Sequence, residues 1–238
     1  MIWLLLSLLD ITNGLYQSER DEFLNSHNAL RRQTYASNMR KMDWSPRLES
    51  LAQDWANRCV FRHSSWQRRR LTGLGDVGEH TYAWPGAPED EPDHISHKVQ
   101  GWYDEITNFR YPNSCYGGPC GHYVGVVWAE TCQIGCGYTY CPRGIAGTKI
   151  RGPATLYVCN YFPLGALRIP PRRGEAPYQS GPPCSKCPEG TRCDNGLCAG
   201  QCSQKKQVRY PPRSRRHLNA ASIEKSTFLK FLQQPQIN

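Results

Sequence analysis

Twelve cysteines in a chain of 238 residues constrain the fold more than any other feature of the sequence. So many cysteines are rare in reducing compartments and point to a scaffold that is cross-linked by disulfides. The cysteines and histidines do not have the spacing of a zinc finger. Cys184-Ser185-Lys186-Cys187 has the spacing of a redox motif, but it lies in a Pro/Gly-rich stretch rather than between a strand and a helix. We therefore expect disulfides and an extracellular location.

The N-terminal residues favour secretion. Ile2–Leu9 is an apolar run of signal-peptide length, and Thr12-Asn13-Gly14 provides small residues for cleavage after Gly14. Asp10 follows the run, no basic segment precedes it, and the run is too short to span a bilayer as a helix. We predict a signal peptide over residues 1–14 and no transmembrane segment in the rest of the sequence.

The net charge of +9 is concentrated near the C-terminus. Residues 203–238 hold eight Lys or Arg and one Glu, so seven of the nine net charges lie there. A nucleic-acid-binding domain would carry such charge on its folded body, so binding of nucleic acid is not expected. Residues 203–238 also lack a sustained core pattern. We predict a disordered basic tail that could contact acidic glycans or lipid headgroups.

The hydrophobic pattern predicts helices followed by strands. Ser45-Pro46 marks the clearest helix start, because a hydroxyl can cap a helix and proline suits its first turn. The predicted helices cover 18–34, 46–59 and 93–106, and the predicted strands cover 78–83, 134–141 and 154–161. Trp84–Pro92 contains three prolines and is expected to be a loop. This order is typical of an α+β fold with helices packed on a small, largely antiparallel sheet.

A short apolar stretch, Gly121–Trp128, has a histidine near its head, and periodicity does not distinguish a strand from a buried turn of helix here. His122 and His63 each lie between a regular element and a cysteine-anchored turn, and Glu79 and Glu105 lie near the ends of predicted elements. Two imidazoles and two carboxylates could hold a divalent cation such as zinc, or form a hydrogen-bonded cluster without metal. Three other histidines are expected at the surface, namely His80, His94 and His97.

Several motifs, in the same order along the chain, resemble those of the CAP superfamily (cysteine-rich secretory proteins, antigen 5 and pathogenesis-related 1). Gly121–Trp128 is similar to the family signature GHYTQVVW. The other matching motifs are His27–Arg31, Met42–Trp44, Cys59–His63, Gly78–Glu79, Trp102–Glu105 and Tyr157–Tyr161. The resemblance covers residues 18–163. A Pro/Gly-rich hinge at 164–183 and a cysteine-rich knot at 184–202 are most similar to those of peptidase inhibitor 16-like proteins.

The resemblance implies a CAP-type α-β-α sandwich in which His63, Glu79, Glu105 and His122 converge in a central cleft. In the family this tetrad can hold a divalent cation, often zinc, and members bind sterols or fatty acids. The disulfides that the resemblance implies are Cys59–Cys141, Cys136–Cys159, Cys115–Cys120, Cys184–Cys193 and Cys187–Cys198. Cys132 and Cys202 are left over, and they could pair with each other, pair between chains or stay free.

The sequence departs from the family pattern in the predicted cleft. Val124 and Gly125 stand where the family has Thr and Gln, and His80 stands where an Asn usually follows Glu79. The second domain of cysteine-rich secretory proteins, which carries ion-channel activity, has no counterpart past Cys202. Channel blockade is therefore not expected.

We predict a secreted, non-enzymatic protein that binds a lipid, a sterol or a protein partner, with a tetrad able to hold a divalent cation. The alternative is an extracellular peptidase that uses the tetrad. Acyl transfer needs an activated Ser or Cys, and Ser64 and Ser65 lie in no nucleophile motif. The zinc-protease helix motif is absent from the sequence. A protease inhibitor is a third hypothesis, for which no exposed reactive loop can be recognised.

Overall fold

The computed structural model describes residues 14–91, 93–165 and 175–202. The predicted basic tail and nearly all of the predicted signal peptide lie outside these residues. The centre of the predicted hinge, residues 166–174, also lies outside them. None of the helices in the described part of the chain combines the length and the hydropathy that a membrane span needs.

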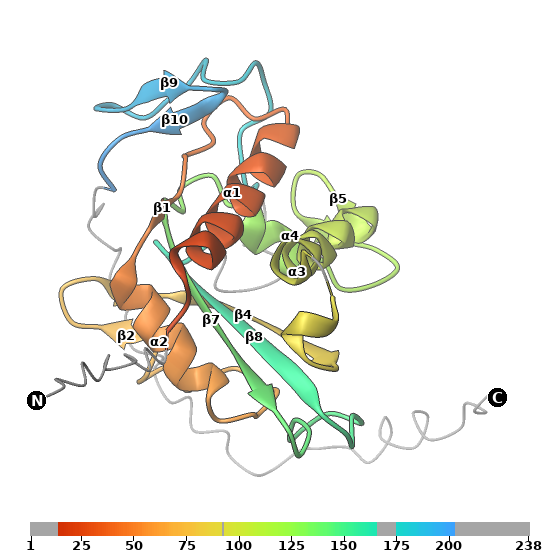
Figure 1. The fold of residues 1–238 in the computed structure, drawn as a ribbon. Helices are drawn as coiled ribbons and strands as arrows, with labels where there is room; N and C mark the ends of the chain where they lie inside the picture. The colour runs from red at the N-terminus through yellow and green to blue at the C-terminus, as the bar shows by residue number, and fades with distance from the viewer. Residues whose placement is uncertain (1–13, 92, 166–174, 203–238) are drawn as a thin grey trace, which may run out of the picture. The chain divides into compact units, whose positions relative to one another are not determined.

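A four-stranded sheet with the order β1-β7-β8-β4 lies at the centre of the fold (Figure 1). The strands are β1 (Asp43–Trp44), β4 (Gly78–Pro85), β7 (Gln133–Cys141) and β8 (Ala154–Phe162). The β4–β8 and β7–β8 pairs are antiparallel, and only the short β1 pairs in parallel, so the predicted antiparallel character is confirmed. β4 extends to Pro85, into the predicted loop. Proline has no backbone N–H to donate to a neighbouring strand. Because β4 is an edge strand and Pro85 is its last residue, this lack costs the sheet little stability.

Helices pack on both faces of this sheet. The α-helices are α1 (Gln17–Gln33), α2 (Pro46–Ala56), α3 (His94–Tyr103) and α4 (Gly121–Val126), with 3-10 turns η1 (Pro88–Asp90) and η2 (Asp104–Asn108). α2 packs on β7 and β8, whereas α1, α3 and α4 pack against one another (Figure 1). Gly121–Trp128, for which the sequence did not distinguish a strand from a turn of helix, therefore begins with a short helix, α4.

The alternation of side chains along β8 explains the two helical layers. Tyr157, Cys159 and Tyr161 belong to a core that also contains residues of α1, α3 and α4. Leu156 and Val158 point the other way, into a second core formed with α2. Every residue of β8 is buried. The predicted α-β-α sandwich is confirmed.

α2 lies directly on the backbone of β7. A Cβ atom added to Gly135 would lie 2.1 Å from the backbone nitrogen of Glu49, and one added to Gly137 would lie 2.7 Å from the Cα of Gln53. These two glycines allow the helix to approach the strand closely. The predicted capping is also present, since the Ser45 hydroxyl accepts a hydrogen bond from the Leu48 amide at 3.4 Å.

A buried arginine connects α1 to the segment that follows α4. Arg31 is completely buried, and its guanidinium donates hydrogen bonds to backbone carbonyls instead of to a carboxylate. The accepting oxygens belong to Arg40, Val126, Trp128, Ala129 and Thr131, at 2.7–3.4 Å. The Arg31 side chain is therefore bonded to the end of α4, the helix that carries His122.

All twelve cysteines form disulfides. The pairs are Cys59–Cys141, Cys115–Cys120, Cys132–Cys202, Cys136–Cys159, Cys184–Cys193 and Cys187–Cys198. Five are the pairs that the family resemblance implies. The sixth joins Cys132 to Cys202, so the structure selects one of the three alternatives left open for these cysteines.

The cysteine-rich knot contains a small antiparallel hairpin, β9 (Arg192–Asp194) and β10 (Leu197–Ala199). Lys41 forms an ion pair with Asp194 at 2.7 Å, and the Cys198 amide donates to the carbonyl of Met39 at 2.8 Å. The knot is thus bonded to the segment between α1 and β1. Outside the knot, β2 (Arg70–Leu71) pairs with β3 (Gly75–Asp76), and β5 (Phe109–Arg110) pairs with β6 (Ser114–Cys115).

Candidate functional site

A cavity of about 660 Å³ lies at the end of the sheet where β4 begins and β8 ends. Three of the four predicted site residues, His63, Glu79 and His122, line it. Glu105 does not line the cavity, but it contacts His122 directly. The remaining wall includes Trp66, His80, Val124, Gly125, Tyr161 and Leu164. Both polar and apolar groups therefore face one cavity.

Glu79 holds the first histidine of the site. Its carboxylate lies 3.3 Å from Nδ1 of His63 and accepts hydrogen bonds from the Ser64 amide at 2.7 Å and the Ser64 hydroxyl at 2.6 Å. Burial opposes ionisation of Glu79, but the bonds from His63 and Ser64 and the nearby Arg69 outweigh it and hold its pKa below the usual range. Glu79 is 5% exposed, whereas the His63 side chain is 57% exposed. The carboxylate is buried, whereas the imidazole is accessible to solvent.

Glu105 holds the second histidine in a similar way. Its carboxylate lies 2.7 Å from Nδ1 of His122 and accepts from the His122 amide at 2.8 Å and the Tyr123 amide at 3.4 Å. Burial again opposes ionisation, and the bonds from His122 outweigh it, so the pKa of Glu105 is lowered. In each pair the carboxylate faces Nδ1. Nε2 of each imidazole is thereby left for another partner.

The structure corrects the prediction for His80, which is buried rather than at the surface. Its exposed fraction is 7%, and its ring lies 4.5 Å from the Tyr161 ring and 5.0 Å from the His122 ring, between ring centroids. His80 pairs with Cys159 across the sheet, and this register directs its side chain toward the core that contains Trp102. Burial lowers the pKa of His80 well below its ordinary value, and the nearby His122 adds to this effect. His94 is half-buried, and only His97 of the three is exposed.

His27 lies behind the cavity wall as a hydrogen-bonded core histidine. Nδ1 donates to the carbonyl of Phe23 at 2.7 Å, so Nε2 accepts from the Tyr161 hydroxyl at 2.9 Å. Burial lowers the pKa of His27 from 6.5 to about 4. A proton on Nε2 would reverse this bond, so that the hydroxyl oxygen of Tyr161, a residue that lines the cavity, would have to accept.

This arrangement predicts a pH dependence of stability. Because the folded pKa of His27 lies below the unfolded value, stability is fully present above pH 6.5 and is lost as the pH falls from 6.5 toward 4. Between pH 7.5 and pH 5, we expect His27 to lower the free energy of unfolding by about 2 kcal/mol. Urea unfolding at both pH values, for the wild type and His27→Gln, would measure this loss. His97→Gln is the matched control, and equal pH dependence in all three proteins would contradict the prediction.

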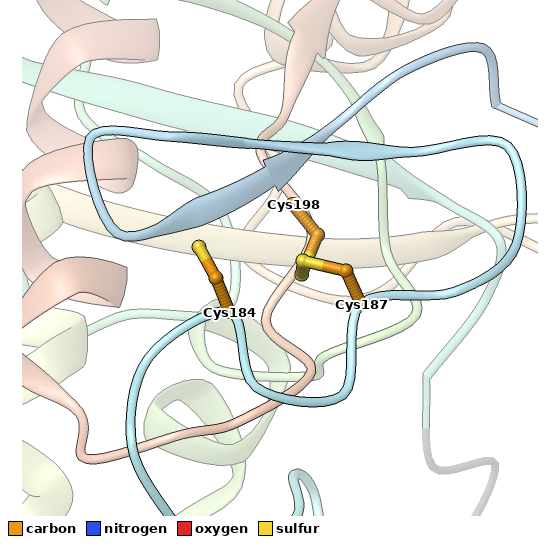
Figure 2. A group of neighbouring side chains, drawn as sticks. All are labelled: Cys184, Cys187 and Cys198. Atoms are coloured by element: carbon orange, nitrogen blue, oxygen red, sulfur yellow. A yellow bond between two sulfur atoms is a disulfide. The ribbon is translucent and has the colours of Figure 1, made fainter.

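Among the described residues, one group of three or more possible metal ligands has its donor atoms within 4.8 Å of one another, and this group lies outside the cavity. The sulfur atoms of Cys184, Cys187 and Cys198 lie within 4.8 Å of one another (Figure 2). Cys187 is bonded to Cys198 and Cys184 is bonded to Cys193, so none of the three is a thiolate. A metal ligand must be deprotonated and free to donate. This group is a pair of neighbouring disulfides.

The α-β-α sandwich and the disulfide pairs are those that the CAP motifs of the sequence imply. The model of the cysteine-rich secretory protein (CAP) family matches residues 24–161, and the chain belongs to this family. The chain is 38% identical to cysteine-rich secretory protein 2 of Homo sapiens over 189 residues, which cover 76% of this chain and 69% of that protein.

Two solved structures are similar in fold. Na-ASP-1 has a TM-score of 0.63 at 27% identity, covering 78% of this chain and 48% of that one. The crystal structure of NaASP2 with Zn2+ has a TM-score of 0.57 at 27% identity, covering 79% of this chain and 98% of that one. The CAP assignment made from the sequence motifs is confirmed.

Proposed function

We propose that this chain is a secreted, non-enzymatic CAP protein whose cavity binds a divalent cation through His63 and His122. Zinc is the leading candidate for this cation. One observation carries the proposal: two imidazoles line one cavity, and each has Nδ1 facing a carboxylate. Metal-binding histidines characteristically use their second nitrogen in this way, because the carboxylate fixes the ring and increases its basicity. Glu79 and Glu105 then orient the two ligands. The similar protein NaASP2 has a crystal structure with Zn2+, which supports the choice of ion.

The extracellular location is supported by the relatives and the covalent structure. The human relative is named as a secretory protein, and the six disulfides of this chain suit an oxidising compartment.

The described residues offer little for covalent catalysis. The cysteines are all in disulfides, and the Ser64 hydroxyl donates to Glu79. A nucleophile would need a base that takes its proton and donors for an oxyanion, and the lowered pKa of Glu79 makes this carboxylate a weak base.

Zinc titration of the full secreted protein by calorimetry tests the cation site. We expect saturable binding with one ion per chain, and His63→Ala/His122→Ala is expected to weaken it at least about 100-fold. Glu105→Gln, which removes an orienting carboxylate, is expected to weaken it about 10- to 100-fold. His97→Ala, an exposed histidine outside the cavity, serves as the control. Unchanged affinity in the double variant would reject the site.

A second candidate ligand is a lipid or a sterol. The cavity volume of about 660 Å³ lies within the range of small-molecule sites, and Trp66, Val124 and Leu164 provide apolar walls. Val124 and Gly125 stand where the family signature has the polar residues Thr and Gln. Their apolar character favours an apolar ligand in the cavity. Uptake of labelled cholesterol or fatty acid by the purified protein tests this proposal. Time-dependent cleavage of casein, lost in Glu105→Ala, would instead indicate a peptidase, and a stoichiometric drop in protease rate would indicate an inhibitor.

A further inference from the structure

We propose that two adjoining arginine-rich segments of the folded domain form a docking surface for a sulfated polysaccharide. The segments are residues 57–70 and 142–153, and together they are called the basic surface. They contain five and three basic residues, respectively, and no acidic residue. Because most of the net charge of the chain lies in residues 203–238, the small net charge of the remaining sequence conceals this local excess. The basic residues are Arg58, Arg62, Arg68, Arg69, Arg70, Arg143, Lys149 and Arg151.

Covalent and backbone bonds hold the two segments side by side. Cys59, in the first segment, forms a disulfide with Cys141, the residue that precedes the second segment. The Phe61 amide donates to the carbonyl of Ala146, and the Ala146 amide donates to the carbonyl of Cys59, both at 2.8 Å. The loop between β7 and β8 thus lies against the segment that follows α2 (Figure 1). Since these bonds form the surface before a partner arrives, binding costs little conformational entropy.

A tryptophan gathers arginines of the first segment. The guanidinium carbons of Arg58 and Arg68 lie 5.5 Å and 5.8 Å from the ring centroid of Trp55. Nε1 of Trp55 donates to the carbonyl of Arg62 at 2.9 Å. Asp54 forms ion pairs with both Arg58 and Arg68. One carboxylate therefore serves two guanidinium groups, and positive charge remains in excess around this ring.

Half of the basic residues are exposed and have no carboxylate partner in the described part of the chain. These residues are Arg62, Arg143, Lys149 and Arg151. By contrast, Arg70 is paired with Asp76 at 3.0 Å, and Arg69 is buried. Like charges held together repel one another, so a partner with several negative charges would relieve this repulsion.

The chemistry of the surface favours one class of anion. Seven of its eight basic residues are arginine, whose planar guanidinium binds the oxygen atoms of anionic groups through paired hydrogen bonds. The charges extend over two segments, which suits a linear polyanion better than a single small anion. Anionic lipids are concentrated in the cytoplasmic leaflet, whereas sulfated polysaccharides are extracellular. The choice of a polysaccharide thus rests on the proposed extracellular location and is independent of the proposed cation.

Binding of the full-length protein to immobilised heparin, at about 0.15 M NaCl, tests the basic surface. The test variant is Arg62→Ser/Arg143→Ser/Lys149→Ser/Arg151→Ser. The matched control, Arg213→Ser/Arg215→Ser/Arg216→Ser/Lys225→Ser, removes the same four charges from the predicted tail. Surface plasmon resonance is expected to show affinity at least about 10-fold weaker in the test variant, because four exposed ion pairs are lost. The control is expected to change affinity by less than about 3-fold.

Three outcomes would overturn the basic surface. Equal losses in the two variants would show that heparin affinity follows net charge, and a larger loss in the control would assign binding to the tail. Absence of wild-type binding to heparin, together with binding to vesicles that contain phosphatidylserine, would replace the polysaccharide with a lipid surface. If the test variant does not fold, Arg143→Ser/Arg151→Ser decides, compared with Arg213→Ser/Arg215→Ser. His63→Ala/His122→Ala is expected to retain heparin affinity, so the cation site and the basic surface can fail independently.

Discussion

Replacement of Arg31 with methionine is expected to lower the free energy of unfolding by about 3–5 kcal/mol. The guanidinium is completely buried, and five backbone carbonyls accept its hydrogen bonds. Burial lowers the pKa of Arg31, but the carbonyl dipoles replace the water that a charged group loses. Methionine fills similar space and donates no hydrogen bond. Several carbonyl oxygens would then be buried without a hydrogen-bond donor. Leaving buried acceptors unpaired in this way lowers the free energy of unfolding.

Arg32 offers a matched control for this prediction. It is the next residue of α1 and makes an exposed hydrogen bond to the carbonyl of Asn195 at 3.0 Å. Arg32→Met is expected to change stability by less than about 1 kcal/mol. Urea unfolding followed by tryptophan fluorescence, with the disulfides intact, would compare the two variants. Similar losses in both would show that the carbonyls around Arg31 are satisfied by other groups.

We also expect weaker zinc binding in Arg31→Met, because the end of α4 loses its hydrogen bond to the guanidinium.

The sequence predicts the regular elements well where a strong local signal agrees with the tertiary structure. The Ser45-Pro46 start of α2 is such a signal, and the structure begins the helix at Pro46. β7 and β8 lie within one residue of their predicted bounds, because both strands are flanked by turns. α2 ends at Ala56 rather than at Cys59, which has a positive φ of 52°. A residue with a positive φ cannot belong to an α-helix, and the apolar periodicity does not reveal this conformation of Cys59.

The parts that could not be predicted depend on register and distant contacts. Gly121–Trp128 is too short for its period to be read, and its helical form is supported by the Arg31 bonds to carbonyls at the end of α4 and beyond it. The sequence places His80 at the surface because the residue lies near a loop. Only the pairing of β4 with β8 shows that it faces the core. Likewise, the approach of Gly125 to His80 joins residues on different elements, and no local motif encodes it.

The geometry of the predicted site also depends on contacts that the sequence does not reveal. The four residues stand out for their chemistry and their resemblance to the family, and the sequence does not reveal how they divide their roles. In the structure, each glutamate faces Nδ1 of one histidine, so the tetrad consists of two pairs. Such pairing depends on ring orientation, which follows from packing around the cavity. Spacing along the chain carries no information about it.

The Cys132–Cys202 disulfide is the covalent link that the sequence left open, and its removal is expected to cost about 4 kcal/mol. The bond closes a loop with a sequence separation of 70 residues, so it restricts the unfolded chain strongly. In the double variant Cys132→Ala/Cys202→Ala, the knot keeps its hydrogen bonds to the segment before β1 but loses its disulfide cross-link to the sandwich. Urea unfolding of the secreted variant would measure the loss, with mass spectrometry to verify the other five bonds.

The Cys184–Cys193 bond provides the comparison that tests this explanation. It lies within the knot and closes a loop with a sequence separation of only 9 residues, so Cys184→Ala/Cys193→Ala is expected to cost about 2.5 kcal/mol. Both variants remove one disulfide and leave ten cysteines paired. A larger loss for the short loop would mean that local strain or packing, rather than loop length, sets the stability contributed by these bonds. The expected order, with the long loop costing more, would instead show that Cys202 stabilises the sandwich by linking it to the knot.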